Sequence, residues 1–296
     1  MSKPTAKPTT VPRRRLARLL TELREKRGLS RDAAAEELEI SRQTLWRYET
    51  GQNAEIKKML IRTVCELYQT TEDEKRLLYF LQEEVRKDGW WQSFGDAIFD
   101  SFELFVALEQ EAIQVISFQL TLLPGLVQTA AYRRVMVQIN DPGASEEAIG
   151  RHLELLAKRQ AKLDQPPDRF GLQVFIGEAA LRYPIGGPIV MRDQLRHLAE
   201  LGTRPNISIR IVPLSVGGFL GLQVGSFVLL DFPEHRNPAL TESPVVYVEG
   251  YIGALYLVKP GEIDKFREAR SEIAEAALDE DESRAMFLAI AEEYKG

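Results

Sequence analysis

Apolar residues recur three and four positions apart through the first ninety residues, and this spacing constrains the fold of that region more than any other feature. Leu16, Leu19 and Leu23 begin the pattern, which places one apolar face along a helix. Gly28 is suited to end that helix, because glycine accepts the left-handed backbone found at helix C termini. The pattern therefore predicts a helix that starts near Arg13.

More short helices are predicted to follow, and two of them begin after a serine. Ser30 is a suitable N-cap for a helix that ends near Leu38, and Ser41 for a helix that ends at Gly51. Two further helices are predicted, near 54–68 and 72–88. Five short helices in fewer than ninety residues predict a compact all-α bundle.

The third predicted helix separates polar from apolar residues. At about 100° per residue, its polar arc holds Arg42, Gln43, Trp46 and Arg47. Leu45 and Tyr48 fall on the other side, where small alanines of the preceding helix would allow close packing. Two helices joined by a short turn around Glu39 and Ile40 form a helix-turn-helix arrangement, whose second helix lies in the DNA major groove.

The residue types on this helix suit the reading of bases. Arginine can donate two hydrogen bonds to guanine, and glutamine can pair in the same way with adenine. The predicted base contacts are Arg42, Gln43, Thr44 and Arg47. The predicted phosphate contacts, which give affinity without sequence choice, are Arg13, Arg14, Arg15, Arg31, Ser41, Trp46, Lys57 and Lys58.

Two alternatives stay open for this segment. Trp46 either stacks on the DNA backbone or is partly covered by a neighbouring domain. The helix as a whole could also be an ordinary solvated amphipathic helix, although the preceding helix and turn favour DNA binding.

The stretch GLSRDAAAEELEISRQTLWRYETGQ resembles the Xre (Cro/C1-type) helix-turn-helix, whose usual form is LSQEELAxxLGVSxxTISRxERG. The matching positions are Ala35, Ile40, Ser41, Thr44, Leu45, Arg47, Glu49 and Gly51. Two residues depart from the family pattern. Glu39 stands where glycine is common in the turn, and Arg31 replaces a glutamine that often contacts phosphate.

The rest of the chain changes in character after the segment DGWWQSFGD at 88–96, which is the predicted domain boundary. Helices are predicted at about 98–118, 128–139 and 145–163, at IVMRDQLRHLAELG, and twice after Pro260. Strands are predicted at FGLQVFIGE, NISIRIVPL, GSFVLLDF and VVYVEG, because these runs are β-branched or aromatic and are bounded by turn residues. The stretch GGFLG is interpreted as a glycine-rich connection followed directly by a strand.

The predicted fold is therefore multidomain, with an all-α helix-turn-helix bundle followed by an α/β (α+β) domain. The second domain should hold a mixed sheet of about four to five strands flanked by helices. The predicted domains are a disordered basic arm at 1–12, a DNA-binding domain at 13–89 and a ligand- or partner-sensing domain at 98–296.

Charge and composition are consistent with this division. Residues 1–70 hold 15 Lys and Arg against 9 Asp and Glu, whereas the remainder holds 23 against 35. A basic segment joined to a larger acidic one is typical of a nucleic-acid reader with a separate sensing body. A single cysteine, no secretory signal and no apolar run long enough for a membrane helix predict a cytoplasmic protein that makes no membrane contact.

From about residue 100 to 290, LPGLVQTAAYRR, GEAALRYPIGGPIVMRDQLRHL, NISIRIVPLSVGGFLGLQVGSFVLLDF and VVYVEG resemble the large C-terminal domain of actinobacterial WhiJ-like Xre regulators. The resemblance implies a transcription factor. It also implies a small partner protein encoded nearby, in a relationship sometimes described as antitoxin-like.

The second domain shows no pattern of an enzyme. Its three histidines are far apart, and no metal-ligand spacing or nucleophile motif occurs, so neither catalysis nor a metal or cofactor is expected. A polar pocket for a ligand or partner is predicted instead from carboxylates near apolar runs, namely Glu109, Glu178, Arg182, Tyr247 and Glu249. The alternative is a simple structural Glu178–Arg182 pair on one helix face.

The leading functional hypothesis is a sequence-specific DNA-binding transcriptional regulator that acts as a homodimer on double-stranded DNA. The second is an antitoxin-like interaction module that sequesters a small partner protein. A hydrolase or transferase is the third and has the least support in the sequence.

Overall fold

The computed structural model describes residues 11–52, 56–86, 94, 100–235, 241–251 and 253–295. Most of the predicted basic arm and of the predicted boundary segment lies outside the described residues. The chain divides into two compact units, the first formed by Met1–Glu111 with Pro233–Glu242 and the second by Ala112–Phe232 with Ser243–Gly296. Each unit is described by itself.

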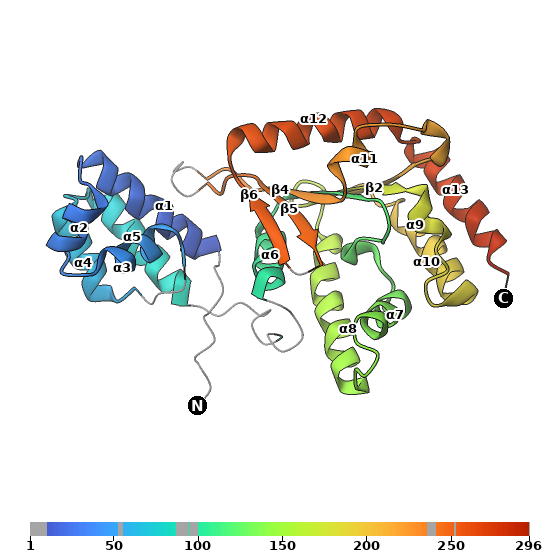
Figure 1. Ribbon diagram of the computed structural model, residues 1–296, viewed down its shortest axis with the longest axis horizontal. Coiled ribbons are helices and arrows are strands. Elements are labelled where there is room, and N and C mark those ends of the chain that lie inside the picture. Colours follow the sequence, from blue (N-terminus) through green and yellow to red (C-terminus); the bar gives the residue numbers. More distant parts are fainter. Residues whose placement is uncertain are drawn as a thin grey trace. The chain divides into compact units, whose positions relative to one another are not determined.

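The first unit is helical, as predicted (Figure 1). Its helices are α1 Val11–Lys26, α2 Arg31–Glu37, α3 Arg42–Glu49, α4 Lys58–Leu67, α5 Glu72–Arg86 and α6 Asp100–Glu111. Helix α1 packs against α3 and α5, and α2 packs against α3. The core is aliphatic and includes Leu16, Leu20, Leu45, Ile61 and Leu78, all of which are buried. The spacing of apolar residues in the sequence thus corresponds to a real buried face.

The second unit is built on one six-stranded mixed sheet with the order β3-β2-β1-β4-β5-β6. The strands are β1 Gln114–Gln119, β2 Gly171–Gly177, β3 Ile207–Val212, β4 Phe227–Asp231, β5 Val245–Gly250 and β6 Gly253–Leu257. Strands β1, β2 and β3 are parallel, whereas β4, β5 and β6 continue the sheet with antiparallel pairings.

Helices cover both faces of this sheet. They are α7 Ala130–Asn140, α8 Glu146–Gln160, α9 Glu178–Arg182, α10 Gly187–Leu201, α11 Gly221–Val224, α12 Pro260–Ala276 and α13 Glu280–Glu293, with short 3-10 turns η2 Gly125–Val127, η3 Ala161–Asp164 and η4 Leu214–Val216. Figure 1 shows α12 along one side of the sheet and α7 and α8 on the opposite side. Helix α13 packs against α10 and β3.

Alternating residues of the strands point to these two layers. Phe118, Phe227 and Val246 belong to a core cluster that also contains Ile263 and Ile273 of α12. Their strand neighbours therefore point to the opposite face, where α7 and α8 lie. The predicted fold class is confirmed, and among the described residues no helix is both long and apolar enough to cross a membrane.

Three local predictions were wrong. The predicted helix at 98–118 ends at Glu111 and is followed by β1, because the apolar run VISF forms a central strand that is covered on both faces. Such a run lacks the polar alternation that separates a strand from a buried helix in sequence. Strand β6 was not predicted, so the sheet has more strands than expected. A short helix, α11, stands between GGFLG and the next strand.

Candidate nucleic-acid interface

The turn between α2 and α3 is held by two serine caps and one left-handed residue. The Ser30 hydroxyl accepts the Ala33 backbone N–H at 3.2 Å, and the Ser41 hydroxyl accepts that of Thr44 at 3.0 Å. Glu39 has a φ of 54°, in the region that favours glycine. Glu39 stands where the helix-turn-helix pattern commonly has glycine. Its backbone therefore adopts the conformation typical of glycine, although the residue carries a side chain.

Helix α3 presents one polar face to solvent. Leu45 is 1% exposed and packs in the core of the first unit, whereas Arg42, Gln43 and Arg47 are exposed. Thr44 is half-buried, and its hydroxyl lies 2.8 Å from that of Ser41. The helical-wheel prediction for the exposed face is thus confirmed for the three long polar side chains.

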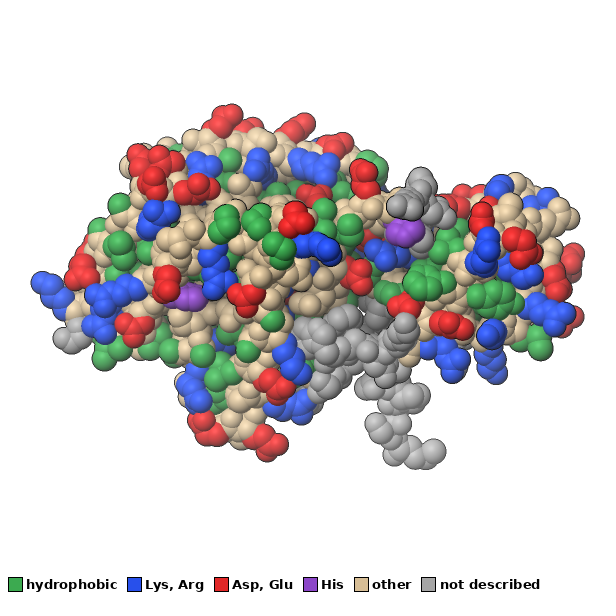
Figure 2. All heavy atoms as spheres, turned by 180° about the vertical axis from the view of Figure 1, so that it is seen from behind, with side chains coloured by type: hydrophobic (Ala, Val, Ile, Leu, Met, Phe, Trp, Pro, Cys, Tyr) green, Lys and Arg blue, Asp and Glu red, His purple; other side chains and the backbone are tan. Residues whose placement is uncertain are grey.

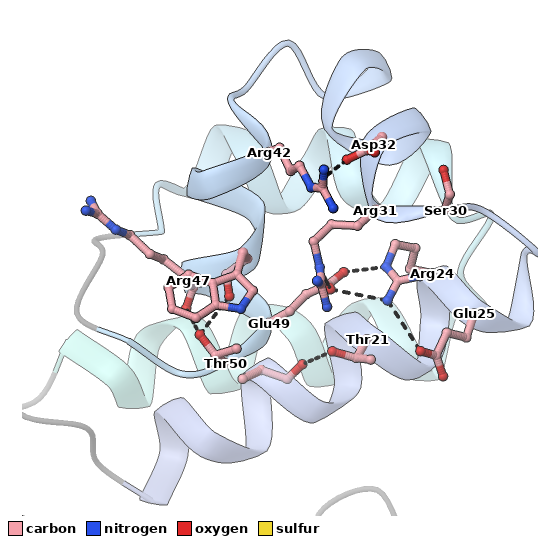
Figure 3. Close-up of polar contacts among 12 residues, drawn as sticks. Thr21, Arg24, Glu25, Ser30, Arg31, Asp32, Arg42, Arg47, Glu49 and Thr50 are labelled. Carbon is pink, nitrogen blue, oxygen red and sulfur yellow. Dashed lines mark hydrogen bonds and ion pairs between the residues drawn. The ribbon is translucent and has the colours of Figure 1, made fainter.

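The two arginines of α3 have different surroundings. Arg42 Nε lies 2.8 Å from an Asp32 carboxylate oxygen, and both side chains are well exposed. Arg47 extends away from the other labelled residues (Figure 3). Trp46 is 38% exposed, so it is available on the same face. An exposed ion pair contributes at most about 1 kcal/mol, so a DNA phosphate or base can displace Asp32 from Arg42 at little cost.

A buried ionic network lies behind this face, and sequence reasoning missed it. The Glu49 carboxylate accepts a hydrogen bond from Arg24 Nε at 2.5 Å and another from Arg31 Nε at 2.8 Å (Figure 3). Arg24 also donates to the Leu29 carbonyl at 2.8 Å. The Glu49 hydrogen bond raises the pKa of Arg24, although burial opposes it. The network ties α1, α2 and α3 together.

The predicted phosphate contacts fall into two groups. Arg13 is 7% exposed, and burial lowers the pKa of its guanidinium. Arg14 pairs with the buried carboxylate of Glu242 at 3.1 Å, and Arg15 lies 3.7 Å from the exposed carboxylate of Glu111. For these residues, and for Arg31 beside Glu49, the placement favours a structural role, and phosphate contact stays a prediction.

The other predicted phosphate contacts are exposed. Ser41, Lys57 and Lys58 lie at the surface, and Lys58 is only loosely paired, 3.8 Å from Glu83. On the face drawn in Figure 2, basic and acidic side chains are interspersed rather than separated into two fields.

The residues predicted to line a pocket in the second domain lie on three elements, α6, α9 and β5, and the pocket stays a prediction. Arg182 Nη2 lies 3.0 Å from Glu178 Oε1, and the other carboxylate oxygen of Glu178 accepts the Leu214 backbone N–H at 2.9 Å. This contact is the Glu178–Arg182 ion pair that was predicted as the structural alternative to a pocket. Tyr247 and Glu249 belong to β5, which is separated from β2 by β1 and β4. Glu109 is buried on α6 in the first unit.

Within the described residues, no three His, Cys, Asp or Glu side chains are grouped so that they could hold a metal ion. Cys65 is buried, and burial raises the pKa of its thiol, so the thiolate form is disfavoured.

Comparison with known proteins agrees with this geometry. Residues 15–78 match the model of a helix-turn-helix domain family, so the first unit belongs to the class of helix-turn-helix DNA-binding regulators. Residues 102–289 match the model of a domain of unknown function, DUF5753. This match spans more than half of the chain, and the protein therefore belongs to the DUF5753 family. No curated protein and no solved structure matches the chain.

Proposed function

We propose that this protein is a sequence-specific transcriptional regulator of the Xre type that reads DNA with α3. The observation that carries the proposal is the exposed set Arg42, Gln43 and Arg47 on a helix that follows a capped helix-turn-helix turn. Their side chains can hydrogen-bond guanine and adenine edges. Thr44, at the N-terminal end of the same helix, is the fourth proposed base contact.

The second unit is proposed to be the sensing part of the regulator. Its helices and sheet form a core of their own, and we propose that this unit binds a ligand or a partner rather than catalysing a reaction. We also propose that this unit corresponds to the large C-terminal domain of WhiJ-like Xre regulators.

Substitution of Arg47 tests the reading of bases. Arg47→Ala should weaken binding to the preferred sequence by about 1–3 kcal/mol and relax the preference at one base position. The measurement is a competition gel-shift series on the region upstream of the gene, with every base of the protected site varied in turn.

Arg76→Ala is a matched control, because Arg76 is an exposed arginine of α5 that pairs with Asp73. It should leave both affinity and preference unchanged. Equal weakening by Arg47→Ala on all sequences would assign Arg47 to a phosphate, and unchanged binding would remove α3 from the interface.

A second candidate function is an antitoxin-like module that sequesters a small partner protein. It is favoured by exposed apolar side chains in the segments that follow β2 and β3, which include Tyr183, Leu214 and Leu222. Isolation of a stoichiometric complex with a small protein, combined with little sequence-specific DNA retention, would support this candidate over the first.

A further inference from the structure

The connection between strands β4 and β5 leaves the sheet of the second unit and becomes part of the first unit. Strand β4 ends at Asp231 and β5 begins at Val245, yet the intervening Pro233–Glu242 clusters with Met1–Glu111. The chain on both sides of this connection belongs to the second unit. The connection is therefore a covalent link by which the strands of one unit hold a piece of the other.

A buried carboxylate holds the end of this connection against helix α1. The Glu242 side chain has no exposed surface, and its Oε2 atom accepts a hydrogen bond from Arg18 Nη2 at 2.8 Å. Its Oε1 atom lies 3.1 Å from Arg14 Nη2. Arg18 Nη2 also donates to the Thr241 carbonyl at 3.1 Å. Arg14 and Arg18 are four positions apart, so they project from one face of α1.

This contact is closed by charge, and it can open without leaving a charge buried. A carboxylate with no exposed surface needs its counter-charges, so the docked position of Glu242 depends on the two arginines. The Arg14 and Arg18 side chains keep 16% and 31% of their surface exposed. On release, water can solvate Glu242 and both arginines. The contact therefore has two discrete states, docked and released.

Helix α1 extends from this contact to the proposed recognition helix. Val11–Lys26 is one continuous helix, and it packs against α3. Near its C-terminal end, Arg24 donates to the Glu49 carboxylate of α3 at 2.5 Å. A continuous series of contacts thus runs from the β4–β5 connection through α1 to α3.

We propose that Thr241 and Glu242 form a latch through which the second unit regulates the proposed recognition helix. Docked, the latch holds α1 in the position from which Arg24 fixes Glu49. Released, by a change at β4 or β5, it loosens α1 and weakens DNA binding by α3. The effect on DNA rests on the proposed function, whereas the docking of the latch does not.

Hydrogen–deuterium exchange of the full-length protein without DNA tests the latch. Glu242→Gln keeps the shape of the side chain but removes its charge. Amide exchange in α1 and in residues 241–244 should rise at least about ten-fold, because the buried ion pairs that close the contact are lost. Glu234→Gln is the matched control, since Glu234 is an exposed glutamate of the same connection. It should exchange like wild type.

Two further measurements distinguish release of the latch from unfolding. Arg18→Gln removes a partner from the other side of the contact and should raise exchange in the same two places. Helix α4 lies in the same unit and packs against α5, so it should keep its wild-type exchange in both variants. Unchanged exchange of α1 in Glu242→Gln overturns the proposal. A rise that includes α4 equally also overturns it, because Glu242 would then stabilise the whole unit.

The affinity for DNA gives a second readout, whose sign differs from that of a simple charge effect. Removal of a negative charge would by itself strengthen binding to DNA phosphates. The latch predicts the opposite, namely that Glu242→Gln binds the preferred sequence at least about five-fold more weakly in a gel shift. Equal or stronger binding overturns the transmission to α3. A wild-type protein without any sequence preference contradicts the DNA-reading function instead, and the exchange experiment still decides whether the latch exists.

Discussion

At the scale of single residues, Glu49 holds α3, the proposed recognition helix, in place. Its carboxylate is 1% exposed and accepts hydrogen bonds from both Arg24 and Arg31. The two arginines differ in burial, because Arg24 is 7% exposed and Arg31 is 35% exposed. If Glu49 were removed, water could therefore solvate the guanidinium of Arg31 but not the buried guanidinium of Arg24.

Glu49→Gln should destabilise the first unit strongly, by about 3–5 kcal/mol, because it leaves the Arg24 cation buried without its counter-charge. Arg31→Gln, which removes the more exposed partner, should cost about 1 kcal/mol or less. Urea unfolding followed by far-ultraviolet circular dichroism measures both. Similar losses for the two variants would show that Arg24 does not depend on Glu49.

At the scale of elements, the turn between α2 and α3 stores a small backbone strain. Glu39 is exposed and adopts a left-handed conformation that a side chain disfavours by about 1–2 kcal/mol. Gly28 and Gly51 end neighbouring helices in the same region of backbone space, with φ values of 69° and 68°. At Glu39 the surrounding helices impose the conformation that glycine adopts freely.

Glu39→Gly should therefore stabilise the protein, by about 1 kcal/mol, as a rise in the unfolding midpoint in urea. The matched control is Glu37→Gly, which removes an equally exposed glutamate from helix α2 and should destabilise by about 1 kcal/mol. A loss of stability on Glu39→Gly would mean that the glutamate side chain contributes more than the strain costs.

At the scale of the whole molecule, one helix-turn-helix unit is small for a specific regulator. One recognition helix reads only a few base pairs, and useful specificity needs two half-sites about one DNA turn apart. The chain as a whole carries a net charge of −6, so its affinity for DNA must come from local basic groups rather than from the average field.

We expect the protein to bind DNA as a homodimer. Sedimentation equilibrium should give twice the chain mass of 33.6 kDa, and footprinting should show two protected half-sites with centres about 10 base pairs apart. A monomer that protects a single half-site would contradict this expectation and would favour the interaction-module candidate.

Predictability from sequence differs between the two units for a physical reason. The helices of the first unit are local structures with their own caps and spacing, and the exposed face of α3 follows from that spacing. Strands β2 to β5 are recognisable as β-branched runs. Strand β1 is not, because a strand covered on both faces is a continuous apolar run, and β6 offers only the short stretch GALYL.

By itself, the sequence determined the helix-turn-helix, the exposed face of its second helix and the change to a sheet-based second unit, because these depend on neighbours within a few positions. Only the tertiary structure decided which charges from different elements meet. It paired Glu49 with Arg24 from a distant helix and separated Glu178 from Glu249 by two strands. Contacts between residues far apart in the chain depend on packing, which no local pattern encodes.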